Sequence, residues 1–185
     1  MVNAARDSRG FALVEVTVSL LLVSLGTLGL AGMQLSAARA SYDAMQRSNA
    51  VAYAMGIMES MRANSTALSH YALADGQNPL AQEFFSRCRI AACNPMELAT
   101  YELWSWRQTL DGSGELEGGL PVGGLVDAQP CIRVTGNNVE VVIAWRGPEP
   151  MSQPGDAGRC GAGLGDSRQA LALRAFIGGR ADGAG

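Results

Sequence analysis

The sequence has no Lys, so its positive charge comes from Arg alone. The 14 basic residues are spread along the chain, the net charge is −3, and no segment gathers them into a basic stripe. Nucleic-acid binding is excluded on this ground, because phosphate backbones are bound by clustered positive charge. The lack of Lys, beside abundant Ala and Gly, indicates genomic codon bias and carries no functional weight.

Histidine is almost as scarce, since His70 is the only one. It lies in a polar stretch that we expect to be an exposed loop, and no Ser/His/Asp or Cys/His triad can be assembled around it. The D-G-S-G-E run at 111–115 departs from the EF-hand pattern and lacks its distal bidentate Glu, so we interpret it as a turn. No phosphate loop or pair of catalytic carboxylates stands out. We therefore predict a protein that is not an enzyme and has no cofactor.

The four cysteines are Cys88, Cys93, Cys131 and Cys160. An even number of cysteines suits disulfides in an oxidising compartment, whereas this spacing with a single His matches no zinc-site pattern, so we predict no metal. Four cysteines allow three pairings. Cys88 with Cys93 and Cys131 with Cys160 is the favoured pairing, because local partners are the simpler choice.

The 185 residues suffice for one modest globular domain plus one long element outside it. Apolar residues are concentrated near the N-terminus, and the segment 11–33 contains a single charge, Glu15. A helix of about 20 apolar residues crosses a hydrocarbon core of about 30 Å. Arg6 and Arg9 precede the segment, so the positive-inside rule places the N-terminus in the cytoplasm and exports the rest.

Two simpler interpretations of this segment are weaker. A secretory signal would be cut after an A-x-A site such as Ala38 to Ala40, but the apolar stretch is long and the helical pattern continues past it. A plain membrane anchor leaves Glu15 unexplained, because a carboxylate in such a helix costs about 2.5 to 3.5 kcal/mol. An ionisable side chain at this depth requires a partner.

The segment from Arg9 to Val16, R-G-F-A-L-V-E-V, resembles the class III signal of type IV prepilins and pseudopilins. A short basic leader ends in Gly, Phe follows, and Glu stands at the fifth mature position. The resemblance implies that a prepilin peptidase cuts between Gly10 and Phe11 and methylates the new amine of Phe11. It also implies that Glu15 pairs with the N-terminal amine of a neighbouring subunit in the assembling filament.

Further segments resemble the PilV-type pilus modification proteins. They are Gly29 to Gln34, Met61 to Asn64, Trp104, Trp106, Leu120 to Gly123 and Val141 to Trp145. The resemblance implies an α+β type IV pilin fold, in which a long N-terminal α-helix packs on the small antiparallel β-sheet of a head. The implied parts are the leader 1–10, a transmembrane and filament-core helix 11–34, its amphipathic continuation 35–63, and an exported head 64–185.

The periodicity of the chain agrees with this plan. No Pro occurs between Met33 and Pro79, and one helix is predicted from about 11 to 62. Its predicted core-facing stripe consists of Leu35, Ala38, Tyr42, Met45, Ala52, Met55 and Met58. The glycines at 26, 29 and 32 indicate either close helix packing or a weak point in the helix.

The head contains one further helix and three strands by the same reasoning. A capped helix start is predicted at Asn94 to Glu97, with Ala99, Leu103, Trp106 and Leu110 on one face. A β-hairpin is predicted from 131–135 and 139–145 around a Gly/Asn turn, with a third strand over 171–177. The Gly- and Pro-rich segment 147–165 is predicted to be a loop, and 178–185 a frayed tail.

We expect a minor pilin that is held in the inner membrane, with its head in the periplasm, until it joins a priming and tip complex of the pilus. The expected partners are the prepilin peptidase, other minor pilins, the major pilin and a tip adhesin. A minor pseudopilin of a type II secretion system shares the same N-terminus and is the alternative. A binding module that contacts a host surface through 118–124 or 147–165 is a third, weaker hypothesis.

Overall fold

The structure is a computed structural model that describes residues 13–77, 88, 92–114, 116–121, 123–148 and 158–178. The chain divides into two compact units, Met1–Tyr42 and Asp43–Gly185, which are described separately below. Helix α1, Leu13–Ala63, contributes residues to both units. The predicted leader, including Gly10, and the predicted new N-terminus Phe11 lie outside the described residues.

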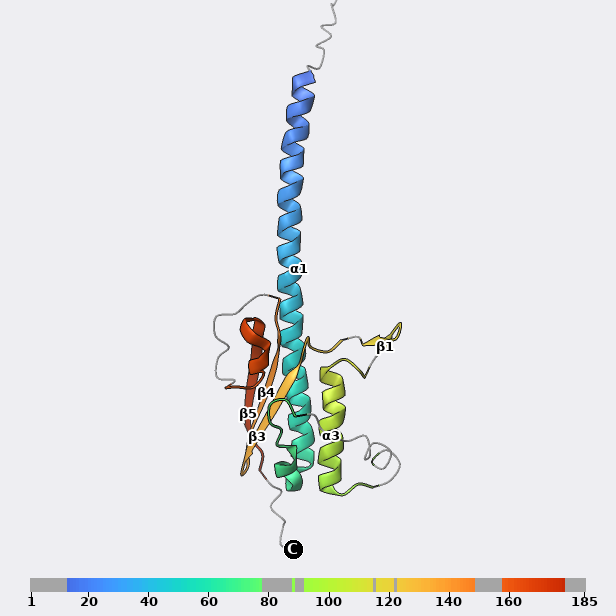
Figure 1. Cartoon of the computed structure of the whole chain (residues 1–185), viewed down its shortest axis with the longest axis vertical. Helices are drawn as coiled ribbons and strands as arrows, with labels where there is room; N and C mark the ends of the chain where they lie inside the picture. The colour runs from blue at the N-terminus through green and yellow to red at the C-terminus, as the bar shows by residue number, and fades with distance from the viewer. Residues whose placement is uncertain are drawn as a thin grey trace, which may run out of the picture. The chain divides into compact units, whose positions relative to one another are not determined.

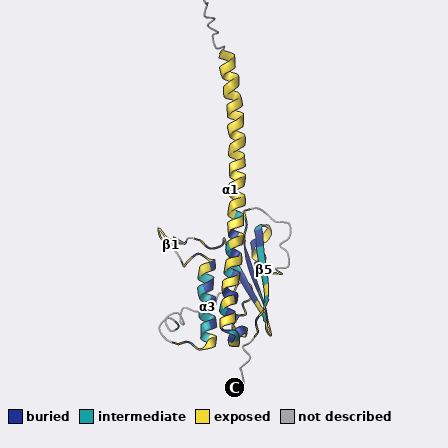
Figure 2. Cartoon of the chain, turned by 180° about the vertical axis from the view of Figure 1, so that it is seen from behind, coloured by how far each residue is buried: buried dark blue, intermediate teal, exposed yellow. Residues whose placement is uncertain are grey.

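In the first unit, every described residue of α1 is exposed, as the yellow ribbon in Figure 2 shows. A window of this helix has a mean hydropathy of 2.0 and no buried residue, so α1 is long and apolar enough to cross a membrane. Its hydroxyl groups bond to the helix itself: Ser19 donates to the carbonyl of Glu15 at 2.7 Å and Ser24 to that of Leu20 at 2.7 Å. Such bonds hide polar groups that hydrocarbon cannot solvate.

In the second unit, α1 buries a face that differs from the predicted stripe. The buried residues of α1 are Gln46, Ala50, Ala54, Ile57, Met58 and Met61. Of the predicted stripe only Met58 is buried, while Met45 and Met55 are 53% and 56% exposed, so that prediction was wrong. The observed face follows Ala50 and Ala54, which are fully buried and belong to the same core cluster as the inner residues of the sheet.

A three-stranded antiparallel sheet covers this face of α1. It consists of β3 (Gln129–Thr135), β4 (Asn138–Arg146) and β5 (Arg168–Phe176), in the order β3-β4-β5 (Figure 1). Its inner face is formed by alternate residues of β4, namely Val139, Val141, Ile143 and Trp145, which are all buried. The predicted hairpin and third strand are both present, and the α+β fold class is confirmed.

Helix α3, Pro95–Leu110, lies beside α1 on the side away from the sheet (Figure 1). It begins with the predicted capping box: Glu97 N donates to Asn94 Oδ1 at 2.9 Å and Asn94 N donates to Glu97 Oε2 at 3.2 Å. The four predicted core residues of this helix are buried, and Trp106 Nε1 donates to the Tyr53 carbonyl of α1 at 2.9 Å. The predicted turn follows directly at 111–114.

Three short features complete the described head. The 3₁₀ helix η1, Ser65–Tyr71, follows α1, and the chain then forms an isolated bridge between Leu73 and Ile132 of β3. A second 3₁₀ helix, η2, Ala162–Ser167, begins inside the segment predicted to be a loop and leads into β5. Strands β1 (Leu116–Glu117) and β2 (Leu120–Pro121) form a small separate pair that the sequence did not predict.

Candidate functional site

The predicted assembly residue Glu15 lies in the exposed apolar part of α1. Its neighbours Leu13, Val14 and Val16 are 81%, 70% and 44% exposed, so the carboxylate stands on an otherwise hydrophobic surface. The glycines at 26, 29 and 32 have open space where a Cβ would stand. Because Gly10 and Phe11 lie outside the described residues, cleavage, methylation and docking stay predictions.

Two disulfides link the head. Cys88 is bonded to Cys93, and Cys131 of β3 is bonded to Cys160, with Cα–Cα distances of 5.2 and 6.0 Å. The Cys131–Cys160 bridge holds the turn before η2 against the outer face of the sheet, where Val142 is also buried. A carboxylate oxygen of Asp75 lies near both sulfurs of this bridge. Since those sulfurs are bonded to each other, they supply no thiolate, and the cluster is not a metal site.

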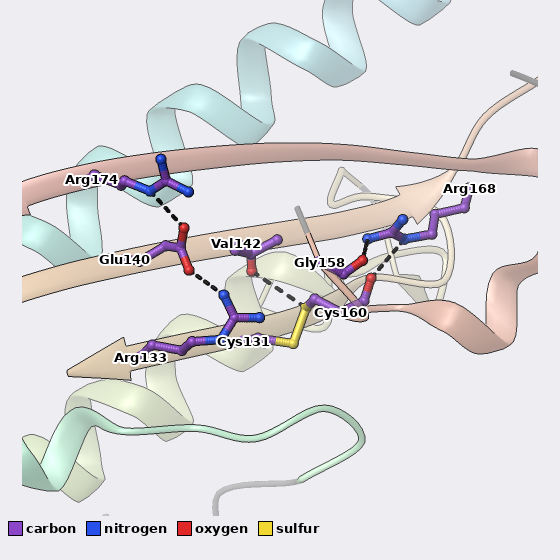
Figure 3. A network of polar contacts seen from close by, with 8 residues as sticks. All are labelled: Cys131, Arg133, Glu140, Val142, Gly158, Cys160, Arg168 and Arg174. Atoms are coloured by element: carbon purple, nitrogen blue, oxygen red, sulfur yellow. Dashed lines mark hydrogen bonds and ion pairs between the residues drawn. A yellow bond between two sulfur atoms is a disulfide. The ribbon is translucent and has the colours of Figure 1, made fainter. Parts of the chain in front are cut away.

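The outer face of the sheet carries a ladder of charged side chains (Figure 3). Glu140 of β4 accepts hydrogen bonds from Arg133 of β3 and from Arg174 of β5, the latter at 2.7 Å. The hydrogen bond from Arg174, with a further one from Arg133, holds the pKa of Glu140 below its ordinary value. Both guanidinium groups stay more than half exposed, so one carboxylate is shared between two cations at a solvent-facing surface.

At the other end of β5, Arg168 is almost fully buried. It donates to the carbonyl of Cys160 at 2.7 Å and to that of Gly158 at 3.0 Å (Figure 3). These hydrogen bonds tie the strand to the disulfide-bonded turn. The period-two alternation of a strand is the signal that could have placed Arg133 and Glu140 on the face opposite the core, but no local signal indicates that one carboxylate joins all three strands.

A second polar cluster lies between η1 and α3. Tyr71, which is fully buried, donates its hydroxyl hydrogen to Glu102, and Asn64 Nδ2 donates to Tyr71 Oη at 3.2 Å and to the Pro95 carbonyl at 2.7 Å. Burial raises the pKa of Tyr71, and the adjacent carboxylate raises it further. The sequence offered no signal for this cluster, because Asn64 and Tyr71 are 31 residues away from their partners Pro95 and Glu102. Its role is to hold the end of α1, η1 and α3 together.

The described residues offer no constellation for catalysis. His70 lies exposed in η1, and the perturbed carboxyls Glu102 and Glu140 are engaged in hydrogen bonds with Tyr71 and with arginines. The features that distinguish the chain are the exposed apolar helix with one carboxylate and the disulfide-linked head. These features are typical of a structural protein.

Comparison with known proteins points the same way. Residues 32–104 match the sequence model of the Tt1218-like family, described as type IV pilin Tt1218. Over these residues the chain is similar to type IV pilins. The pilin match covers less than half of the 185 residues, from the end of the apolar part of α1 through most of α3. Comparison with curated proteins finds no match, and comparison with solved structures finds none either.

The family and the fold agree. A long N-terminal helix packed against a three-stranded antiparallel sheet is a pilin-like α+β arrangement, and type IV pilins are structural proteins without enzymatic activity. Among the described residues one helix, α1, is long and apolar enough to cross a membrane, which is consistent with pilin anchoring. The match begins at residue 32, so it includes neither Glu15 nor the leader.

Proposed function

We propose that the chain is a minor pilin of the PilV type, which takes part in type IV pilus assembly within a minor-pilin priming and tip complex. Prepilin peptidase cuts it after Gly10 on the cytoplasmic side, and the subunit waits in the inner membrane with its head in the periplasm. Other minor pilins and the major pilin are its filament partners, and a tip adhesin is a further one.

The observation that carries this proposal is the contrast between the two parts of α1. The part before Asp43 buries nothing within the chain and exposes an apolar surface, whereas the later part is the spine of the head core. A surface of this kind needs lipid before assembly and other subunits afterwards. A filament subunit uses both environments in turn.

Glu15 gives the apolar surface its specificity. A carboxylate in hydrocarbon is unfavourable alone, but it becomes acceptable when an N-terminal amine from the next subunit pairs with it. The free amine exists at the correct depth only after cleavage between Gly10 and Phe11. The proposal therefore couples processing to assembly: an uncut subunit keeps its leader and presents no amine within the apolar layer.

The two disulfides support export of the head. Both bridges lie after α1, and such bonds persist in oxidising compartments such as the periplasm. The core they hold together is small, so cross-links of this kind contribute a substantial share of its stability. The same orientation follows from Arg6 and Arg9 ahead of the apolar segment.

Deletion of the gene tests the function, with surface pili, twitching motility and type II secretion scored in the same strain. We expect loss of pili and motility with secretion intact. Restoration is expected from the wild-type chain and from Glu59→Gln, a matched carboxylate loss on the exposed surface of α1, but not from Glu15→Gln.

Each other outcome identifies a different function. A secretion defect with normal pili would make the chain a pseudopilin. Normal numbers of pili with reduced adherence would favour the binding module. Full rescue by Glu15→Gln would remove the docking role from this carboxylate.

A further inference from the structure

The two edges of the head sheet are built differently. In an antiparallel sheet, alternate residues of an edge strand direct both N–H and C=O either toward the neighbouring strand or away from the sheet. At the β3 edge the outward position Ile132 exchanges two hydrogen bonds with Leu73, at 2.8 and 2.9 Å. The outward position Pro130 has no N–H to offer. This edge is largely closed.

The β5 edge presents its backbone groups differently. Gly147 N donates to the Ser167 carbonyl at 2.7 Å and Ile177 N donates to the Asn137 carbonyl at 2.8 Å, so the odd-numbered residues of this strand face β4. The even-numbered residues, among them Ala170, Ala172 and Phe176, therefore direct their N–H and C=O groups out of the sheet. No backbone hydrogen bond joins these three to another described residue.

Strand β5 itself carries none of the interruptions that commonly keep an edge strand from pairing. It pairs with β4 over nine consecutive residues, from Arg168 to Phe176, without a bulge and without Pro. Natural edge strands that must stay unpaired are commonly short, bulged or interrupted by Pro. A regular edge of this length is a template for one more strand.

The charged side chains beside the β5 edge favour one kind of added strand. Strand β5 contains no acidic residue; Arg168 at its start is buried, whereas the side chain of Arg174 is 65% exposed and Phe176 beside it is 70% exposed. Arg174 and Arg133 both contact Glu140, and the side chain of Arg133 stays 53% exposed (Figure 3). A hollow of about 400 Å³ lies beside them, and its lining includes Arg133, Glu140, Arg174, Asn138 and Phe176.

We propose that the outer edge of β5 binds an extended segment of a partner protein that carries acidic residues on one face. The segment forms a fourth strand through the outward backbone groups of Ala170, Ala172 and Phe176. An acidic side chain then meets Arg174, and an adjacent apolar side chain covers Phe176. The inference concerns the head alone and goes beyond the proposed role in assembly.

A second copy of the chain fits this edge less well. Antiparallel pairing of two β5 strands about Ala172 would place Arg174 diagonal to Arg168 of the other copy, on the same face of the sheet. Pairing about Arg174 would set two guanidinium groups directly opposite each other, and like charges opposed across strands are destabilising. Since neither arrangement supplies a carboxylate, charge complementarity favours a different, acidic partner.

Binding is measured with full-length protein in detergent micelles and a fluorescent nine-residue peptide with blocked ends. The probe alternates Val on one face with Thr and Glu on the other. One control peptide has Arg in place of Glu. Another is N-methylated at every second amide, on the edge that would pair with β5. We expect saturable binding of the acidic peptide alone, weakening as salt rises.

Variants of the protein separate backbone pairing from charge. Ala172→Pro removes an outward N–H but no β4–β5 hydrogen bond, so it should raise the Kd by about tenfold or more in a folded head. Val134→Pro, at an outward position of the β3 edge, is its control. Arg174→Gln should raise the Kd about two- to fivefold, and Arg62→Gln, an exposed arginine on α1, should leave it unchanged.

Three results would overturn the proposal. One is the absence of binding by the acidic peptide; the second is equal affinity of wild type and a folded Ala172→Pro variant. The third is self-association of the wild type in sedimentation experiments that Ala172→Pro abolishes, because the occupant would then be a second copy. None of these depends on whether the chain assembles into pili, since the full-length subunit is tested in micelles.

Discussion

Tyr71 donates its phenolic hydrogen to the carboxylate of Glu102 and so joins η1 to α3. Asn64, at the end of α1, donates to the same hydroxyl and to the Pro95 carbonyl at the start of α3. The end of α1, the η1 helix that follows it and the distant helix α3 thus meet at one buried oxygen. The Asn94 capping box begins α3 at the same place, so the start of this helix and the end of α1 are fixed together.

Tyr71→Phe removes the hydroxyl and leaves Asn64 and Glu102 with buried polar groups that lack this partner. We expect the free energy of unfolding to fall by about 1 to 3 kcal/mol. Tyr53→Phe is a suitable control on α1, because the hydrogen bond between Tyr53 and Trp106 uses the backbone carbonyl of Tyr53, and it should cost less than about 0.5 kcal/mol. Urea unfolding in detergent, followed by tryptophan fluorescence, measures both. Equal midpoints for the two variants would contradict this role of Tyr71.

The lowered pKa of Glu140 predicts how the stability of the folded head changes with pH. Hydrogen bonds from Arg174 and Arg133 lower its pKa in the folded head below the ordinary 4.5, so the unfolded chain takes up a proton first as pH falls. The stabilisation is therefore complete above pH 4.5 and is lost as the pH drops through the lower, folded-state pKa. Glu140→Gln should be less stable than wild type at neutral pH.

The variant should also lose less of its stability on acidification than the wild type. Unfolding curves at a series of pH values between 2 and 7 test this, with Glu59→Gln as an exposed ion-paired control. Parallel pH profiles for wild type and Glu140→Gln would show that the arginine ladder contributes nothing to folding.

The two disulfides should differ in how much they contribute to the free energy of unfolding. Cys131 and Cys160 close a loop with a sequence separation of 29, whereas Cys88 and Cys93 are separated by 5. Loop-closure entropy then assigns roughly 3.5 kcal/mol to the first bridge and roughly 2 kcal/mol to the second. Paired Cys→Ser variants, compared by thermal unfolding, measure the difference. A larger loss from the short loop would contradict the entropic argument.

Gly124 fits closely against the end of α3. Its φ is +73°, and an added Cβ would lie 2.5 Å from the backbone nitrogen of Gly112 and 2.8 Å from the carbonyl oxygen of Leu110. Gly124→Ala should therefore destabilise the head by at least about 2 kcal/mol. Gly123 has a similar φ of +78° but open space, so Gly123→Ala should cost about 1 kcal/mol. Equal costs would mean that the contact with α3 relaxes without penalty.

Local signals predicted the elements of the head well. The Asn94 cap with Pro95 and Glu97 predicted the start of α3, and the apolar spacing predicted its buried face through Leu103 and Leu110. The turn at Gly136 and the flanking β-branched residues predicted the β3–β4 hairpin. Such features depend on residues close together in the chain, where propensity and periodicity are informative.

Features that depend on residues far apart in the chain were harder to predict from the sequence. The core face of α1 was assigned to a stripe that included Met45, Ala52 and Met55, whereas the buried face follows Ala50 and Ala54. Which helix face meets the sheet depends on shape, not on apolar count alone. The bridge between Leu73 and Ile132 and the Tyr71–Glu102 contact join distant segments and have no local signature.

The central claim is that the chain is processed and built into a pilus, and the N-terminus of the mature protein tests it most directly. Mass spectrometry of the protein from sheared, purified pili should find a peptide that begins with N-methylated Phe11. An intact Met1, a start after Ala40, or an unmethylated Phe11 would contradict the account, and so would absence of the protein from pili that assemble normally.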